Sequence, residues 1–127
     1  MTIHRKLSSA LLLAAAIGLA CPAFAQDDAK LQASAKLYDT YCAQCHGVNR
    51  NGKGVNTIGL SVQPRDHSDT AGMSTLPATQ MFTAIKGGGA AVNKSALMPA
   101  WGSVLTDDEI NDMVDYLRHV CKCGAAK

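Results

Sequence analysis

The sequence lacks a hydrophobic run long enough for a permanent transmembrane helix. Its one sustained apolar stretch, Leu11 to Ala20, is too short to span a bilayer, and no later segment is long and apolar enough. Basic residues precede this stretch (His4 to Lys6), and the small-x-small site Ala23-Phe24-Ala25 follows it. This order is typical of a secretory signal peptide. We therefore expect residues 1–25 to be cleaved before Gln26, leaving a soluble mature protein in the periplasm, across the inner membrane.

The expected mature chain also lacks an excess of charge of either sign. Twelve Lys and Arg residues less Arg5 and Lys6 leave ten, which equals the ten acidic residues, so the net charge of +2 belongs to the precursor. A nucleic-acid partner needs a basic face with clustered cations, and this balance gives it no support.

Lipidation of Cys21 is a weaker alternative to simple cleavage, because Gly18 and Leu19 stand where such sites carry a large apolar residue and then a small one.

No strand-like alternation and no internal repeat is present, and helical periodicity takes their place. It predicts helices over about 29–42, over 77–86 and after the capping box of Thr106 and Glu109. Residues 47–76 show neither period and predict a long loop. We expect a single all-α domain over residues 26–127, with three or more helices and long loops around one bound group. The apolar positions of these helices are Leu31, Ala35, Tyr38 and Cys42, then Met81, Phe82 and Ile85, then Ile110, Met113, Val114, Leu117 and Val120.

The stretch Cys42-Ala43-Gln44-Cys45-His46 carries the strongest chemical signal. Two thiols separated by two residues and followed by histidine form a covalent c-type haem attachment motif. The spacing lets both sulfurs bond to vinyl-derived carbons on one edge of the porphyrin, which leaves His46 as the proximal iron ligand. The sequence therefore predicts one haem c per chain, attached through Cys42 and Cys45.

Met98 is the expected second ligand of the iron. It lies in Leu97-Met98-Pro99-Ala100-Trp101, a segment between the triple glycine 87–89 and the last helix, where a loop can present a thioether without breaking a helix. The alternatives are weaker, because they lie on apolar helix faces, in an unpatterned loop or in settings that do not fix them. These alternatives are Met81, Met113, Met73, His67 and His119.

With these motifs the chain resembles the class I c-type cytochromes over nearly all of its expected mature region. The segments that carry the resemblance are Cys42 to Gly47, Gly52-Lys53-Gly54, Pro64-Arg65-Asp66, Ile85 to Gly88, Met98 to Trp101 and Tyr116-Leu117. The resemblance implies that the first and last helices cross steeply, with small residues and Tyr116 or Leu117 at the crossing. It also implies axial ligation by His46 and Met98, a bond from the His46 ring N–H to the Pro64 carbonyl, and propionate contacts from Arg65 and Trp101.

An iron held on both faces has no open position for a substrate, so we expect a one-electron carrier and not an enzyme. Its partners would be redox proteins or respiratory complexes in transient contact, with Lys86 and Lys94 flanking the haem edge. Two other classes stay open. A dithiol oxidoreductase would use Cys42 and Cys45 as a redox pair, and a catalytic or sensor haem protein would keep an open distal site.

Cys121 and Cys123 fall outside the resemblance. In an oxidising compartment they favour a disulfide, either with each other or to another chain. A metal site that also uses His119 is the weaker interpretation, because no fourth ligand is evident.

Overall fold

The computed structural model describes residues 22–124, and within that range the chain forms helices and loops without strands. Most of the expected signal peptide therefore lies outside the described residues. The elements are α1 (Pro22–Tyr41), α2 (Ala43–His46), the 3₁₀ turn η1 (Val55–Thr57), α3 (Thr70–Ser74), α4 (Ala78–Gly87), the 3₁₀ turn η2 (Gly89–Val92) and α5 (Asp107–Cys121).

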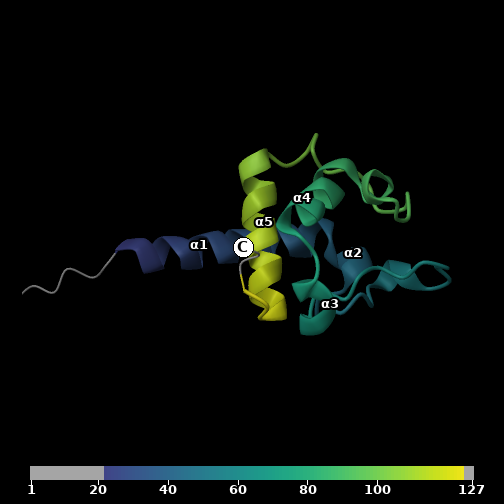
Figure 1. Ribbon diagram of the computed structural model, residues 1–127, viewed down its shortest axis with the longest axis horizontal. Coiled ribbons are helices and arrows are strands. Elements are labelled where there is room, and N and C mark those ends of the chain that lie inside the picture. The colour runs from purple at the N-terminus through teal and green to yellow at the C-terminus, as the bar shows by residue number, and fades with distance from the viewer. Residues whose placement is uncertain (1–21, 125–127) are drawn as a thin grey trace, which may run out of the picture.

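The first and last helices pack against each other and cross steeply, as Figure 1 shows. Tyr38 of α1 and Tyr116 of α5 meet at the crossing with their ring centroids 5.9 Å apart. Ser34, one turn before Tyr38, is also fully buried, so a small residue lies on the packed face of α1. This arrangement confirms the all-α fold expected from the sequence.

Helix α5 begins and ends where its sequence dictates. The Thr106 hydroxyl accepts from the backbone N–H of Glu109 at 3.2 Å, and the Glu109 carboxylate accepts from the Thr106 N–H at 2.8 Å, which completes the capping box. Its buried side chains form one stripe, and Lys122 ends the helix in the left-handed conformation. The expected helix over 77–86 is observed as α4, which ends at Gly87 and is followed by Gly88, a residue with a positive φ of 78°.

Two segments differ from the sequence-based expectation. Helix α1 begins at Pro22, well before residue 29. The region 47–76 is not wholly a loop, because it contains η1 and the five-residue helix α3. The Asp69 side chain caps α3 by accepting from the N–H of Ala71, and tertiary packing buries Met73 completely. The Thr70 hydroxyl also donates to the Cys121 carbonyl at 2.6 Å, which holds α3 against the end of α5.

Among residues 22–124, no helix combines the length and the apolar character needed to cross a membrane.

Candidate functional site

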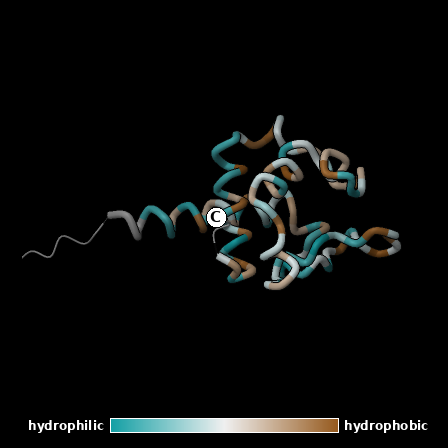
Figure 2. The backbone as a smooth tube through the Cα atoms, in the orientation of Figure 1, coloured by the Kyte–Doolittle hydropathy of each residue, from teal (hydrophilic) through white to brown (hydrophobic). Residues whose placement is uncertain are grey.

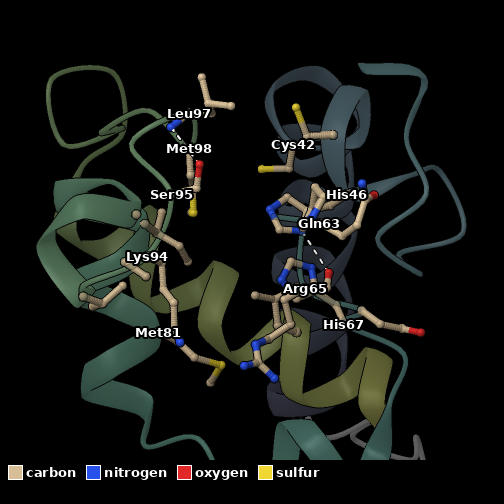
Figure 3. A pocket seen from close by; sticks show the side chains of 18 of the residues that line it. Cys42, His46, Gln63, Arg65, His67, Met81, Lys94, Ser95, Leu97 and Met98 are labelled. Carbon is tan, nitrogen blue, oxygen red and sulfur yellow. Dashed lines mark hydrogen bonds between the residues drawn. The ribbon is translucent and has the colours of Figure 1, made fainter. Parts of the chain in front are cut away.

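A cavity of about 410 Å³ lies between the segment that carries the Cys-x-x-Cys-His motif and the loop that carries Met98. Figure 3 shows His46 and Met98 facing each other from opposite sides of this pocket. Side chains from α1, α2, α3, α4 and α5 contribute to the wall, as do those of the loops 60–67 and 94–101. The helices thus surround a space that borders the buried apolar core of the domain.

His46 lies at the end of α2 and is oriented by a backbone contact. Its Nδ1 lies 3.0 Å from the carbonyl oxygen of Arg65, so an Nδ1–H donates there and Nε2 is left free as a ligand. Burial lowers the pKa of His46, partly offset by this hydrogen bond, so the ring is held neutral.

The acceptor expected for this bond was the carbonyl of Pro64, and that expectation is wrong. The Pro64 carbonyl oxygen lies close to Gly52 instead, where a Cβ would be only 2.5 Å from it. Gly52, which has a positive φ of 74°, allows this close approach. The next carbonyl along the chain, that of Arg65, therefore faces the imidazole, while Pro64 still lines the cavity.

Met98 is held in the opposite wall by backbone hydrogen bonds. Its carbonyl accepts from the Gly89 N–H at 3.0 Å, and its N–H donates to the Ser95 carbonyl at 3.2 Å. Gly88 permits this packing, because a Cβ there would lie 2.8 Å from the Met98 carbonyl oxygen. The triple glycine thus ends α4 and also lets the methionine loop lie close against it.

The two cysteines of the motif are free thiols that line the same cavity as His46 and Met98. Burial, and then the neighbouring Cys45, raises the pKa of Cys42 to about 11. A redox-active dithiol needs the opposite, a thiol whose pKa is lowered so that the nucleophilic thiolate is present. This environment argues against the dithiol oxidoreductase interpretation and suits cysteines that are consumed in permanent bonds.

Sequence reasoning named His67 as a rival ligand but missed the contacts that its ring makes with His46 in the cavity wall. The ring of His67 stacks on that of His46, and the Tyr38 hydroxyl lies 3.1 Å from His67 Nδ1 and 3.5 Å from the His46 carbonyl oxygen. Burial, and then Cys42, raises the pKa of Tyr38, so its hydroxyl keeps its proton. Tyr38 could have indicated these contacts from the sequence, because it lies on an apolar helix face and a buried tyrosine hydroxyl requires a hydrogen-bond partner.

The other residues singled out from the sequence are divided by the fold. Arg65 and Trp101 both line the cavity, and Trp101 also packs against Tyr41 with the ring centroids 5.2 Å apart. Three of the rival ligands, Met73, Met81 and Met113, are buried in the cavity wall. His119 is exposed on α5 and does not line the cavity.

The mouth of the cavity has apolar side chains and a lysine. Leu97 and Val62 line it and are 69% and 55% exposed, and Lys94 lines it as well. Figure 2 shows hydrophobic segments on the two loops that project on the side away from the start of α1. Lys86 was expected to share this role, but it does not line the cavity, and its Nζ binds the Asp107 carboxylate at 2.7 and 2.8 Å.

Cys121 and Cys123 form a disulfide with each other, so the local pairing is confirmed. In the part of the chain that the structure describes, no group of three or more His, Cys, Asp or Glu side chains is placed to hold a metal ion.

Comparison with known proteins finds similarity to a family model, to a relative in sequence and to a solved structure. Residues 29–117 match the family model described as cytochrome c oxidase, cbb3-type, subunit III. The quinohemoprotein alcohol dehydrogenase ADH-IIG of Pseudomonas putida is 32% identical over 96 residues, which is 76% of this chain but only 11% of that protein. The solved KustC0563 c-type cytochrome is 24% identical, with a TM-score of 0.55 over 68% of this chain and 95% of that one, a likeness that shows the fold.

The residues around the cavity fit the haem c that this family implies. An imidazole and a thioether face each other, two thiols lie beside the imidazole, and much of the rest of the wall is apolar. These are the donors that hold an iron porphyrin for electron transfer in c-type cytochromes. The chain belongs to the cytochrome c family of cbb3-type subunit III, within the class I c-type cytochromes, proteins that transfer electrons through haem.

Proposed function

We propose that the protein is a periplasmic one-electron carrier that uses a single haem c, bound covalently through Cys42 and Cys45. The observation that carries this proposal is the placement of His46 and Met98 on opposite sides of one cavity that both thiols line. The haem supplies a reversible one-electron change at its iron. His46 and Met98 would hold the iron from opposite sides of the cavity, which would leave no coordination position for a substrate.

The chain's own residues tune and protect this centre. The Arg65 carbonyl holds the His46 ring in one orientation and leaves Nε2 as the atom that would coordinate the iron. Met73, Met81 and Met113 are buried in the wall and give it apolar side chains. A thioether ligand beside such a wall would favour the ferrous form and raise the reduction potential. Arg65 and Trp101, which line the same cavity, are proposed to contact the propionates.

One haem per chain and a periplasmic location rest on the sequence. The chain has one Cys-x-x-Cys-His motif, and its N-terminal 25 residues have the order of basic, apolar and small residues of a secretory signal. The cysteines also agree with export. Cys121 and Cys123 form a disulfide, a bond that persists in oxidising compartments such as the periplasm, while Cys42 and Cys45 are free for attachment to the haem.

The partners proposed for this centre are redox enzymes or respiratory complexes that dock briefly at the cavity mouth. Leu97 and Val62 offer exposed apolar surface there, and Lys94 adds a positive charge that attracts an acidic partner. An alcohol dehydrogenase is one candidate class of electron donor, since one relative is named for that activity. A small contact of this kind allows the fast release that a carrier requires.

Replacement of Met98 by Ala tests the proposal directly. We expect the purified holoprotein to lose its sulfur-to-iron charge-transfer band and the ferrous form to bind carbon monoxide readily. Met81→Leu is the matched control, because Met81 lines the same cavity. This variant should keep the wild-type spectrum. Ready carbon monoxide binding by the ferrous wild type would favour the catalytic or sensor class, and an unchanged Met98→Ala spectrum would remove the assigned ligand.

A further inference from the structure

A second pair of sulfur atoms lies at the end of α5, away from the cavity lining. Cys121 and Cys123 are joined across the single residue Lys122. Cys121 is completely buried, whereas Cys123 is half-buried. Only one of the two sulfurs is therefore within reach of a molecule that approaches from solution.

A buried cation lies against this disulfide. Arg118 is only 4% exposed, and its Nη1 lies 3.6 Å from Cys123 Sγ. The same guanidinium donates to the carbonyl oxygens of Met73, at 2.7 Å, and of Leu76, while its buried Nε has no hydrogen-bond partner. Across residues 22–124, no carboxylate forms an ion pair with it.

A guanidinium in that position stabilises an anion more than a neutral group. Burying a charge without a counter-charge is costly, and a disulfide sulfur supplies none. Opening the disulfide would place a Cys123 thiolate beside Arg118 and provide the missing counter-charge. The end of α5 opposes a thiolate through its helix dipole, but that dipole is equivalent to about half a charge, whereas Arg118 carries a full charge at contact distance.

We propose that Cys121 and Cys123 form a second redox site, one that exchanges an electron pair with protein dithiols. Stabilisation of the thiolate favours the reduced form, which distinguishes an exchangeable disulfide from a purely structural one. The site works without the haem, so this inference does not rest on the proposed carrier function.

The exchange proceeds in two balanced steps. A thiolate of the partner dithiol attacks the half-buried Cys123 Sγ, forming a mixed disulfide, and Cys121 Sγ leaves and takes up a proton. The partner's second thiol, once deprotonated, attacks the partner's first sulfur, which is bonded to Cys123 in the mixed disulfide. Cys123 then leaves as a thiolate held by Arg118. The partner ends as a disulfide and this chain as a dithiol, with two electrons transferred.

Equilibration of the holoprotein with mixtures of reduced and oxidised glutathione tests the proposal. Free thiols are alkylated after acid quenching, and the reduced fraction is read from the mass of the C-terminal peptide. We expect the wild type to open in buffers that leave structural disulfides closed, while the haem absorption is unchanged. A disulfide that stays closed across the whole series would overturn the proposal.

Two substitutions distinguish the effect of the buried Arg118 charge on disulfide reduction from the effect of an exposed positive charge nearby. Arg118→Gln should raise the excess of reduced glutathione needed for half-reduction by about tenfold, because it removes one charge-assisted contact to the thiolate. Lys122→Gln removes an exposed charge between the same two cysteines and should change it by less than about twofold. Equal shifts in the two variants would contradict the role of Arg118.

A third measurement uses the wild-type side chain at Arg118 and stays informative if Arg118→Gln does not fold. With oxidised glutathione, Cys121→Ser should form a mixed disulfide at Cys123 quickly, and Cys123→Ser should form one at Cys121 slowly. Equal rates, or the reverse order, would show that Cys123 is not the point of attack.

Discussion

The imidazole rings of His46 and His67 stack nearly parallel, with centroids 4.3 Å apart and planes inclined by 16°. Two protonated rings at this distance would repel each other. Burial lowers the pKa of His67 to about 3, followed by the repulsion that a protonated His46 would exert and by the positive charge of Arg65. The stack therefore consists of two neutral rings, and the fold keeps the ring behind the proposed iron ligand uncharged.

The neutral state of His67 makes stability depend on pH. Its folded-state pKa is below the unfolded value, so between about pH 6.5 and 3 only the unfolded chain takes up this proton. Stability should fall with decreasing pH in that window, by about 1.4 kcal/mol per pH unit from this residue. Urea unfolding at several pH values should show a shallower dependence in His67→Phe than in the wild type. His119→Gln, at an exposed position, should keep the wild-type slope, and equal slopes in all three proteins would contradict the assignment.

Gly54 allows the loop after the motif to lie directly on α2. Its N–H donates to the Cys45 carbonyl at 3.0 Å, and a Cβ there would lie 2.6 Å from the Cys45 carbonyl carbon. Because its φ of −79° suits any residue, the expected cost of Gly54→Ala, about 1–3 kcal/mol of unfolding free energy, is purely steric. Gly59→Ala is the control, since its Cβ meets nothing within 4 Å and only its φ of 81° costs energy, about 1 kcal/mol. A larger loss at Gly59 than at Gly54, measured by urea unfolding, would refute the steric account.

The capping box contributes to the stability of α5. Thr106→Ala removes the hydroxyl that accepts from the Glu109 N–H, and we expect a loss of about 1 kcal/mol in thermal or urea unfolding. Thr83→Ala, in the middle of α4 and exposed, removes a hydroxyl of the same kind without affecting a helix end. Its effect should be near zero or slightly stabilising. Comparable losses of unfolding free energy in both variants would mean that the destabilisation of Thr106→Ala does not come from loss of the helix cap.

Lys94 should steer anions toward the cavity mouth. The oxidation of the reduced holoprotein by ferricyanide, a small trivalent anion, should slow about threefold in Lys94→Gln at low ionic strength. The difference should vanish at high salt. Lys36→Gln removes an exposed charge on α1 that does not line the cavity, and its rate should match the wild type. A decrease in the oxidation rate of Lys94→Gln that does not depend on salt, or an equal decrease in Lys36→Gln, would argue against electrostatic steering by Lys94.

What the sequence predicted well depends on local patterns. The helix period, the Thr106 cap and the glycines after α4 are each written within a few residues, and the structure contains the corresponding elements. The all-α fold and the family follow from the same local motifs, and the comparisons confirm both. The placement of His46 and Met98 across one cavity agrees with the expected ligand pair, whose coordination stays a prediction.

What the sequence did not predict depends on contacts between distant segments. Helix α3 has only five residues, too few to show a period, and is held by the burial of Met73 and by the bond from Thr70 to Cys121. The choice between the Pro64 and Arg65 carbonyls depends on which way the backbone turns beside Gly52, which residue identity does not determine. The stacking of His67 likewise depends on where a loop returns to α1.

The crossing of α1 and α5 sets the order in which the domain can assemble. Tyr38 and Tyr116 meet only after nearly the whole described chain is available, and Met113 and Leu117 of α5 complete the cavity wall. A chain delivered with its N-terminus first therefore presents Cys42, Cys45 and His46 before the helix that encloses their cavity has emerged. The motif is thus more exposed while the chain lacks α5 than after α5 has packed against it.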